Sequence, residues 1–277
     1  MNLNYVYIND TFVESAQASL LISDLSIQRG YGIFDFFKTI NGKPIFLEDH
    51  LERFYHSANK MHLDVGYTKE QLKSILDELL VKNNIPDAGI RITLTGGYAT
   101  DGYTLAKPNM VITQQPLSLK LEIDPKGISL VTYPHQRQLS DVKTLDYLMA
   151  IWLQPFIKEQ GADDVLYHAD GLIKECPRSN FFIVNGNNEV ITAQNHVLKG
   201  VIRKNVLQLN HPDFKVIERD FNLQELENAT EAFITSTTKH ILPVVGINGK
   251  QIGDGKAGSV TKKLSDLLLQ NIRHQIG

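Results

Sequence analysis

The chain has one cysteine, Cys176, and one tryptophan among 277 residues. A single cysteine cannot form an intramolecular disulfide, so the sequence favours a reducing compartment and we expect a cytoplasmic protein. No uninterrupted apolar run approaches the roughly 18 residues of a membrane-spanning helix. The first residues also lack the basic start and apolar stretch of a signal peptide. We therefore expect no membrane partner and no export.

The chain also lacks a large excess of charge of either sign. It has 28 Lys and Arg and 31 Asp and Glu, which gives a net charge of -3. No basic cluster stands out, so nucleic acid and anionic membranes are not expected partners. The nine histidines show no His-x-x-x-His spacing, and no metal site is expected. With 42% hydrophobic and 21% charged residues, the chain has the composition of a globular protein and is long enough for two domains.

In the first part of the chain, apolar residues that recur every three to four positions predict helices over residues 47–61 and 68–83. Thr68 and Gln71 have the spacing of a capping box at the start of the second helix. Strands are predicted at 5–8, 11–13, 36–40, 44–46, 90–95 and 110–113, with hairpin turns at Asn9-Asp10 and Asn41-Gly42.

The later part of the chain also mixes strands and helices. A strand over 128–133 precedes an apolar helix over 144–160 that is interrupted near Pro155. Short strands with hairpin turns at 170–171, 186–187 and 248–249 follow, with helices at 201–209, 223–228 and 260–272. Because residues 116–127 are polar and rich in turn formers, we expect a small α+β domain over 1–115, a linker over 116–127 and a large α+β domain over 128–277.

The most informative feature is a lysine followed by three motifs at set distances. Lys143 lies between an apolar strand and the apolar start of a predicted helix, a place that favours burial of its amine. The motifs are Glu175-Cys176-Pro177-Arg178-Ser179-Asn180, Leu198-Lys199-Gly200-Val201-Ile202 and Thr235-Ser236-Thr237-Thr238. An amine, a carboxylate, a glycine turn at a helix start and a cluster of hydroxyls are the groups needed to hold pyridoxal phosphate.

This order and spacing resemble the fold-type IV pyridoxal-phosphate enzymes, which include D-amino acid aminotransferases, branched-chain aminotransferases and aminodeoxychorismate lyases. The resemblance covers nearly the whole chain, from Arg29-Gly30-Tyr31-Gly32 to Asp254-Gly255-Lys256. It implies an α+β enzyme of two domains, the larger one with a mostly antiparallel, barrel-like core. It also implies a homodimer, because the family builds its sites across a subunit interface.

The resemblance implies a role for each motif. Lys143 is the amine that binds the cofactor aldehyde and then moves the substrate α-proton as a general base. Glu175 pairs with the pyridine nitrogen, and Leu198 packs against the ring face. The expected phosphate site consists of Arg53, Val201, Ile202, Ser236 and Thr237. Each residue also has an ordinary interpretation, since most lysines are solvated surface charges and residues 235–238 can simply be a strand end rich in threonine.

Three positions depart from the family pattern. Pro177 stands two residues after the glutamate, where relatives usually have a small residue. Ile202 replaces a common threonine, which removes one hydroxyl contact and leaves the backbone donor. Asp146 stands where asparagine is frequent, and nothing in the sequence gives that change a function.

The substrate carboxylate needs a cation or a set of donors. The better-known D-amino acid aminotransferases use an Arg-x-His pair in the loop after the strand over 90–95, and that loop has neither residue here. Arg29 and Arg178 are the alternative pair, suited to the carboxylate of a small D-amino acid or of a dicarboxylate. Tyr31 and Thr238 are expected to line the same pocket.

The Ser236-Thr237-Thr238 stretch is closer to the D-amino acid group than to the branched-chain group. We therefore predict a transaminase that exchanges an amino group between a D-amino acid, such as D-alanine or D-glutamate, and a 2-oxo acid such as 2-oxoglutarate, by a ping-pong mechanism. An aminodeoxychorismate lyase and a branched-chain L-amino acid aminotransferase are the alternatives within the family. A non-catalytic dimeric module that binds a phosphate metabolite is the alternative outside enzymes.

Overall fold

The computed structural model describes residues 4–118 and 121–276. The chain divides into two compact units. The first holds residues 4–118 together with Val142–Asp146 and Ile276, and the second holds residues 121–141 and Tyr147–Gln275. Residues 1–3, 277 and 119–120, the last pair within the expected linker, lie outside the described residues. The expected domain limits stay a prediction.

The first unit is built on a six-stranded antiparallel sheet in the order β2-β1-β6-β5-β3-β4. Its strands are β1 (Tyr5–Ile8), β2 (Thr11–Glu14), β3 (Gly32–Ile40), β4 (Lys43–Pro44), β5 (Ala88–Thr95) and β6 (Met110–Pro116). The predicted hairpin turns at Asn9-Asp10 and Asn41-Gly42 are confirmed, and all four residues have the positive φ that tight hairpins require.

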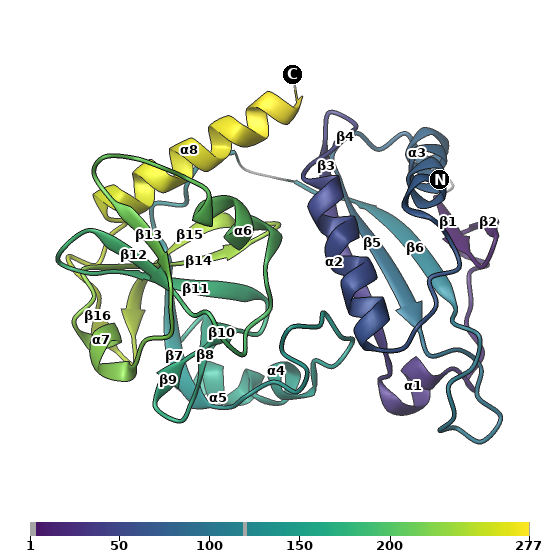
Figure 1. Cartoon of the computed structure of the whole chain (residues 1–277), viewed down its shortest axis with the longest axis horizontal. Helices are drawn as coiled ribbons and strands as arrows, with labels where there is room; N and C mark the ends of the chain where they lie inside the picture. Colours follow the sequence, from purple (N-terminus) through teal and green to yellow (C-terminus); the bar gives the residue numbers. More distant parts are fainter. Residues whose placement is uncertain (1–3, 119–120, 277) are drawn as a thin grey trace. The chain divides into compact units, whose positions relative to one another are not determined.

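Two helices, α2 (Leu47–Lys60) and α3 (Lys69–Asn83), cover one face of this sheet (Figure 1). Their apolar stripes meet strand side chains in one core, whose members include Leu51, Phe54, Leu76, Ile90 and Ile92. The predicted capping box is confirmed: Gln71 N donates to Thr68 Oγ1 at 3.2 Å, and Thr68 N donates to Gln71 Oε1 at 2.8 Å.

A short helix that the sequence analysis missed, α1 (Leu25–Arg29), precedes β3. Buried Asp24 caps it by accepting from Ser26 N at 2.8 Å. The other carboxylate oxygen of Asp24 accepts from the side chains of Thr95 and Asn109 at 2.7 Å each. Asp24 therefore ties α1 to β5 and to the loop before β6, which fixes where the chain enters β3.

The segment Val142–Asp146 completes the edge of the sheet at β3. Ile33 and Thr144 form an antiparallel bridge, Phe34 N donates to Lys143 O at 3.0 Å, and Leu145 N donates to Gly32 O at 2.9 Å. A Cβ at Gly32 would meet Leu145 Cδ1 at 2.7 Å and Leu94 O at 2.8 Å, so the close approach requires glycine.

The helix predicted over 144–160 is wrong in its first part, because the backbone around Thr144 bonds to β3 instead of forming a helical turn. The helix begins at Leu148 and is divided into α4 (Leu148–Trp152) and α5 (Gln154–Glu159). The expected interruption near Pro155 is confirmed, and this proline lies in the first turn of α5, where its missing N–H costs no helical hydrogen bond.

The second unit is built on a ten-stranded sheet whose main path runs β13-β12-β11-β14-β15-β7-β8-β9, with β10 paired to β11 and β16 to β15. Its strands are β7 (Ile128–Pro134), β8 (Asp164–Ala169), β9 (Leu172–Ile173), β10 (Glu175–Cys176), β11 (Ser179–Val184), β12 (Glu189–Thr192), β13 (Lys215–Glu218), β14 (Glu231–Ser236), β15 (His240–Ile247) and β16 (Lys250–Gln251). Most neighbours are antiparallel, and three pairs, β12–β13, β15–β7 and β7–β8, are parallel.

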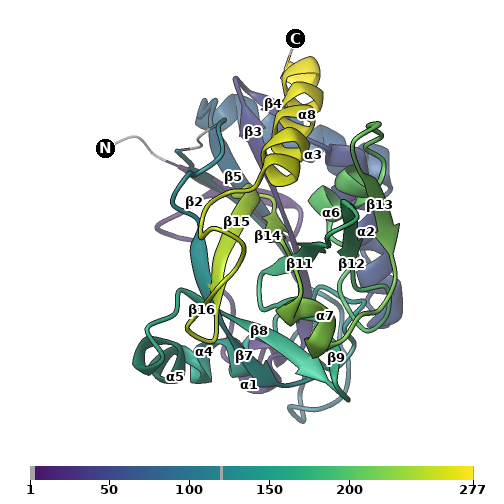
Figure 2. The ribbon, with the colours of Figure 1, turned by 90° about the vertical axis from the view of Figure 1, so that its left-hand side faces the viewer.

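This sheet curls around one apolar core, and Figure 2 shows the path turning from β13 across β14 and β15 to β9. Side chains from both ends of the path meet in the core, among them Ile173 of β9 and Ile191 of β12. On the opposite face, the rings of Phe182 and Phe233 stack with centroids 4.8 Å apart. Every residue of β11 is buried, so this central strand is a rigid base for the residues at its ends.

The helices of the second unit also include α6 (Val201–Leu207), α7 (Leu223–Glu227) and α8 (Ser259–Ile276). These three were predicted from the sequence, with ends that differ by at most four residues. Over residues 4–118 and 121–276, no helix combines the length and the apolar character needed to cross a membrane.

Candidate active site

Lys143 is held in the first unit by its backbone. Its carbonyl accepts from Phe34 N on β3, and its N–H donates to the hydroxyl of Ser57 on α2 at 3.3 Å. Its Nζ lies 4.5 Å from the centroid of the Phe34 ring, and the residue is half-buried. A strand edge and a helix therefore position this amine, which is the arrangement that a nucleophile needs.

Arg53, the expected phosphate arginine, lies on α2 and is held by Asp35 of β3. Arg53 Nε and Nη2 donate to the two carboxylate oxygens of Asp35 at 2.8 Å each, and His50 Nδ1 lies 2.7 Å from Asp35 Oδ1. Burial favours a raised pKa for Asp35, but the charges and hydrogen bonds of Arg53 and His50 hold that pKa well below its usual value. Sequence reasoning identified Arg53 and missed Asp35 and His50.

Electrostatics connect His50 to Lys143. Burial lowers the pKa of His50, the carboxylate of Asp35 opposes that shift, and the positive charges of Arg53 and Lys143 lower the pKa further. In the first unit, the expected amine and the expected phosphate arginine therefore belong to one electrostatic group.

Arg29 and Tyr31 lie at the end of α1. Arg29 is exposed, and its Nη1 donates to Gln28 O at 2.9 Å. Tyr31 donates its hydroxyl to Met61 O, just past the end of α2, at 2.8 Å, and burial raises the pKa of that hydroxyl. Their expected roles toward a substrate stay a prediction.

Lys38 is a fully buried amine in the first unit, and the sequence analysis did not single it out. Its side chain is 1% exposed, and among the described residues its Nζ has no hydrogen-bond partner. Burial lowers the pKa of Lys38 to about 7. A signal was present in the sequence, because this lysine interrupts the apolar strand at residues 36–40.

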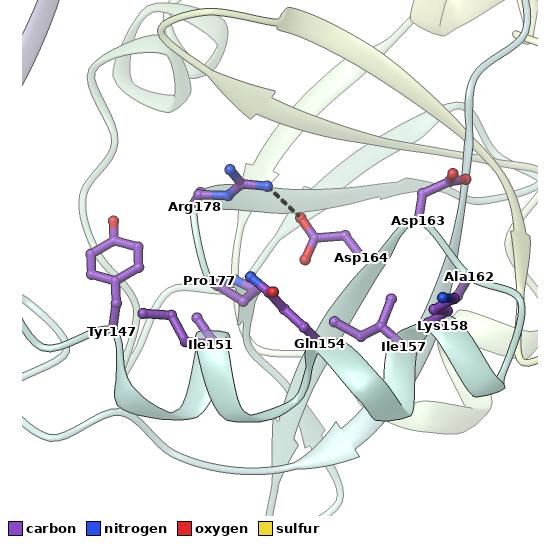
Figure 3. A pocket seen from close by; sticks show the side chains of 11 residues that line it. Tyr147, Ile151, Gln154, Ile157, Lys158, Ala162, Asp163, Asp164, Pro177 and Arg178 are labelled. Carbon is purple, nitrogen blue, oxygen red and sulfur yellow. Dashed lines mark ion pairs between the residues drawn. The ribbon is translucent and has the colours of Figure 1, made fainter.

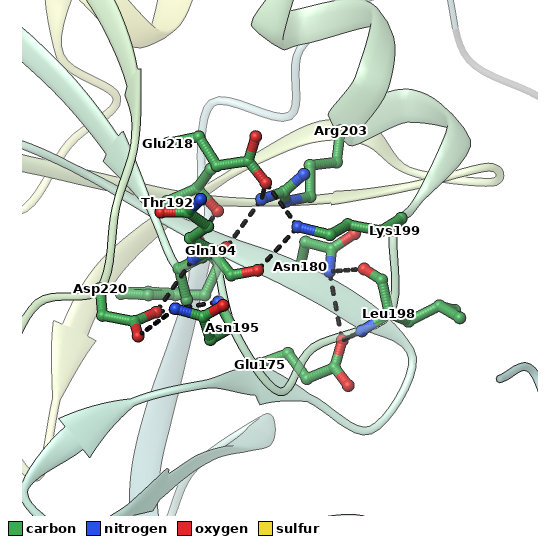
Figure 4. A network of polar contacts seen from close by, with 12 residues as sticks. Glu175, Asn180, Thr192, Gln194, Asn195, Leu198, Lys199, Arg203, Glu218 and Asp220 are labelled. Carbon is green, nitrogen blue, oxygen red and sulfur yellow. Dashed lines mark hydrogen bonds and ion pairs between the residues drawn. The ribbon is translucent and has the colours of Figure 1, made fainter. Parts of the chain in front are cut away.

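In the second unit, Glu175 lies in a network that also contains Asn180 and Leu198 (Figure 4). Oε2 of Glu175 accepts from Leu198 N at 3.0 Å and from Asn180 Nδ2 at 3.2 Å. Asn180 Nδ2 also donates to Leu198 O at 2.7 Å. A Cβ on Gly200 would lie 2.1 Å from Asn180 Oδ1, so glycine there leaves room for this amide. The expected pyridine partner, ring wall and helix start are thus joined through one asparagine.

Arg137 is a further member of this site that the sequence analysis missed. Its Nε donates to Glu175 Oε1 at 2.9 Å, and its Nη2 donates to Ser140 O at 2.7 Å. The side chains of Arg137 and Glu175 are 17% and 6% exposed. The carboxylate of Glu175 is therefore buried beside a guanidinium. No spacing rule links residues 38 positions apart, and only the folded chain brings them together.

The expected phosphate residues Val201 and Ile202 are buried in the first turn of α6, whose N-cap is Gly200. Arg203 of the same turn is 2% exposed and donates from Nη2 to Ala193 O and to Glu218 Oε1, both at 2.7 Å. These two bonds tie α6 to Ala193, just past β12, and to Glu218 of β13, and Figure 4 shows the contact between Arg203 and Glu218.

Ser236, Thr237 and Thr238 form the end of β14 and the turn that leads into β15. Ser236 Oγ accepts from Lys239 N at 3.2 Å within that turn. Next to it, Thr235 is 2% exposed, and among the described residues its hydroxyl has no hydrogen-bond partner. A buried hydroxyl without a partner is costly. These hydroxyls and the start of α6 both belong to the second unit. Hydroxyls and the backbone N–H groups of a helix start are donors that a phosphate group requires. The residues present therefore fit the expected cofactor.

Arg178 lies in the tight turn between β10 and β11, because Glu175 pairs with Asn180 and Cys176 pairs with Ser179. Pro177 begins this turn, so Arg178 does not continue the strand. Its side chain is 68% exposed, and its Nη2 lies 4.0 Å from Asp164 Oδ2.

A cavity of about 510 Å³ adjoins Arg178 within the second unit (Figure 3). Its wall includes charged and polar side chains as well as apolar ones, namely Tyr147, Ile151, Gln154, Ile157, Lys158, Asp163, Asp164, Pro177 and Arg178. Burial raises the pKa of Asp164, although Val165 N donates to its carboxylate. This volume lies in the range of small-molecule sites.

Comparisons with known proteins identify the family. The profile of the family described as amino-transferase class IV matches residues 32–247. The chain is 31% identical over 268 residues to the D-alanine aminotransferase of Staphylococcus haemolyticus, covering 94% of this chain and 95% of that one. It is also 31% identical over 272 residues to a putative branched-chain-amino-acid aminotransferase of Methanocaldococcus jannaschii, covering 94% of each.

The fold of this chain matches that of solved structures. The branched-chain amino acid aminotransferase of T.th. with pyridoxamine 5'-phosphate superposes with a TM-score of 0.89 at 21% identity, covering 99% of this chain and 95% of that one. The branched-chain aminotransferase of Thermoproteus uzoniensis with norvaline gives a TM-score of 0.87 at 24% identity, covering 99% and 96%. The expected fold-type IV architecture is confirmed, and the chain belongs to the class IV aminotransferases, enzymes that use pyridoxal phosphate.

Proposed function

We propose that Lys143 carries the cofactor and moves the substrate proton, with Glu175 at the pyridine nitrogen and Leu198 against the ring. Arg53, Val201, Ile202, Ser236 and Thr237 hold the phosphate. The cofactor supplies the electron sink for the carbanion formed at the substrate α-carbon. The observation that carries this proposal is the buried Glu175 carboxylate, which Arg137, Asn180 and Leu198 N hold through three hydrogen bonds of 2.9–3.2 Å. Such a carboxylate suits a protonated ring nitrogen.

Reduction with borohydride tests the assignment of the amine. We expect the pyridoxyl label on Lys143 after digestion and peptide mapping, and no label in Lys143→Ala. Lys38 is the internal control, because it is another amine of the same unit and burial lowers its pKa. A label on Lys38, or none at all, would contradict the proposal.

We further propose a transaminase selective for D-amino acids, with 2-oxoglutarate as amino acceptor. Several relatives of about 30% identity are named D-alanine aminotransferases, and they support this choice. The M. jannaschii relative, at the same 31% identity, supports L-branched-chain amino acids as the second candidate.

One pair of assays separates these candidates. With D-alanine and 2-oxoglutarate we expect pyruvate and glutamate in equal amounts, and loss of the cofactor absorbance in the half-reaction with D-alanine alone. L-leucine is the matched competitor. If L-leucine discharges the cofactor faster than any D-amino acid, the branched-chain alternative replaces our proposal. Pyruvate without glutamate would instead indicate a lyase.

Arg178, Arg29, Tyr31 and Thr238 are our candidates for binding the substrate. The long 4.0 Å contact with Asp164 supports Arg178, because at that distance it satisfies none of the guanidinium donors. A bidentate carboxylate is the ligand that such a fork prefers. Arg29, exposed at the end of α1, is the second cation of the proposed pair.

We also propose a homodimer, as the family resemblance implies. Leu148, Ile151 and Trp152 on α4 are 72%, 63% and 62% exposed, and Leu139 is 55% exposed. Large apolar side chains this exposed often mark a protein interface. Sedimentation equilibrium tests this idea. We expect the mass of a dimer for the wild type and weaker association for Trp152→Glu, and a monomeric wild type would be the contrary result. The expected cytoplasmic location stays a prediction.

A further inference from the structure

We propose that Arg137 is a positioning residue that drives the proton of the Glu175–pyridine pair onto the ring nitrogen. The proposal rests on the proposed function, in which Glu175 faces that nitrogen. Arg137 lies outside the three sequence motifs, and its part in the reaction is electrostatic, through the carboxylate that it contacts.

The geometry fixes the guanidinium of Arg137. Its Nε donates to Glu175 Oε1 at 2.9 Å, while its Nη2 donates to Ser140 O at 2.7 Å. Gln136 anchors the backbone, because its Nε2 donates to Arg137 O at 3.2 Å and to His196 O at 3.1 Å. Two acceptors on different parts of the chain hold one rigid fork, so the charge is preorganised before any cofactor binds.

Three described donors to Glu175 differ in charge. Asn180 Nδ2 and Leu198 N are neutral donors, and both bond to Oε2. Arg137 bonds to Oε1 with a positively charged guanidinium. Arg137 and Glu175 are both largely buried, so bulk water screens their attraction less than it would at the surface. Of these three contacts, the one with Arg137 therefore favours the ionised form of Glu175 most strongly.

The sign of the effect follows from distance. A proton shared by Glu175 and a ring nitrogen lies either on the carboxylate, beside Arg137, or on the nitrogen, farther from it. A positive charge repels the proton, so Arg137 favours the arrangement with ionised Glu175 and a protonated ring. A protonated ring withdraws electrons more strongly, which is what removal of the substrate α-proton requires.

The experiment uses holoenzyme loaded with cofactor that carries ¹⁵N in the ring, and follows its ¹⁵N chemical shift from pH 6 to 9. In the wild type we expect the shift of a protonated ring across this range. In Arg137→Gln we expect the ¹⁵N shift to move toward that of an unprotonated ring throughout this range, because the shared proton then lies on Glu175 and is not lost to the solvent. Arg137→Lys keeps the charge and is expected to retain most of the protonated signal.

A matched control is Arg219→Gln, which breaks another arginine–glutamate pair of the same unit. Arg219 Nη2 lies 2.6 Å from Glu225 Oε1, and neither residue contacts Glu175 in the described hydrogen bonds. Its ring shift should match that of the wild type. Steady-state kinetics provide a second readout, in which Arg137→Gln lowers kcat about tenfold or more while KM for the amino acid changes little.

Two outcomes overturn different claims. If loaded Arg137→Gln and Arg137→Lys both keep the wild-type shift while Glu175→Gln moves it, the role of Arg137 is wrong and that of Glu175 stands. If Glu175→Gln leaves the shift unchanged, the proposed pairing of Glu175 with the ring nitrogen is wrong. Should Arg137→Gln not fold, Arg137→Lys still decides. A ring ¹⁵N shift in Arg137→Lys equal to that of unprotonated cofactor would contradict a role based on charge.

Discussion

The guanidinium of Arg53 and the carboxylate of Asp35 form a two-bond ion pair that joins α2 to β3, with both contacts at 2.8 Å. Asp35 is fully buried, and the side chain of Arg53 is 10% exposed. Both bonds use one edge of the guanidinium, Nε and Nη2, so the strand fixes the orientation in which the other edge of Arg53 meets a ligand. In the proposed function that ligand is the cofactor phosphate.

Asp35→Asn should destabilise the protein and weaken cofactor binding. It leaves Arg53 buried without its counter-charge, and breaking a buried pair in this way costs about 3–5 kcal/mol. We expect a loss of this order in the free energy of unfolding of the apoprotein in urea at pH 7, and a higher dissociation constant for pyridoxal phosphate. Glu48→Gln is the control, since it removes the exposed ion pair between Glu48 and Lys73 and should cost under about 1 kcal/mol.

The pH dependence of this difference has a definite sign. The folded-state pKa of Asp35 lies below its unfolded value of about 3.9. The contribution of ionised Asp35 is therefore complete above that value and is lost as pH falls through the folded-state pKa. The gap between wild type and Asp35→Asn should shrink in acid, and a gap that stays constant from pH 7 to pH 2 would contradict this account.

Lys38→Met should stabilise the protein at neutral pH. The pKa of Lys38 is lowered to about 7 in the fold, against about 10.4 in the unfolded chain, so the unfolded chain binds more protons between these values. Wild-type stability should consequently rise by about 1.4 kcal/mol per pH unit from roughly pH 7 to pH 10, as the unfavourable burial of charge is relieved. At pH 7 and below, the full cost of that charge remains and methionine avoids it.

Urea unfolding at several pH values measures this slope. Lys38→Met should lose that part of the wild-type slope, whereas Lys262→Met, at an exposed position of α8, should keep it. Equal slopes in wild type and Lys38→Met would mean that Lys38 is not buried as an amine.

The elements that the sequence predicted are those with strong local signals. The capping box at Thr68 and the paired turn residues Asn41 and Gly42 act over a few positions, and both are found in the structure. The start of the helix over 144–160 was wrong because its apolar residues fit a helix as well as a strand edge. A distant partner, β3, decided between them, and no local pattern carries that information.

In the candidate site, too, the residues with a local sequence signal were predicted and those with only distant contacts were not. Motif spacing pointed to Glu175 and Leu198, which the structure joins through Asn180. Arg137 and His50 could not be found, because each owes its importance to one contact with a residue far away in sequence. Asp35 gave a partial signal, since a carboxylate inside the apolar strand Phe34-Asp35-Phe36-Phe37 must find a partner if it is buried.

Gly200→Ala should disturb the network around Glu175 with little effect on the rest of the fold. The new Cβ would lie 2.1 Å from Asn180 Oδ1, so the amide must move and its bonds to Glu175 and Leu198 O weaken. We expect weaker cofactor binding, about tenfold or more, measured by fluorescence titration of the apoprotein, because loss of a hydrogen bond to a charged group costs about 1.5–3 kcal/mol.

Gly186→Ala provides the control for that substitution. Gly186 lies in the turn after β11, a Cβ there would meet no atom within 4 Å, and its φ is not positive. Its cofactor affinity should equal that of the wild type. If Gly200→Ala binds cofactor as tightly as Gly186→Ala does, Asn180 does not depend on the room that glycine leaves.

Arg178→Ala should raise KM for the amino acid and for the 2-oxo acid together, by about tenfold or more, with a smaller change in kcat. Both substrates carry the α-carboxylate that Arg178 is proposed to bind, and a charged hydrogen bond contributes about 1.5–3 kcal/mol. Arg178→Lys keeps the charge and loses the two-pronged fork, so its KM should lie between those of wild type and alanine. The folded structure should tolerate both changes, because the side chain is 68% exposed and its contact with Asp164 is 4.0 Å long. Unchanged KM values for both substrates in Arg178→Ala would remove this arginine from the substrate site and leave Arg29 as the remaining candidate of the pair.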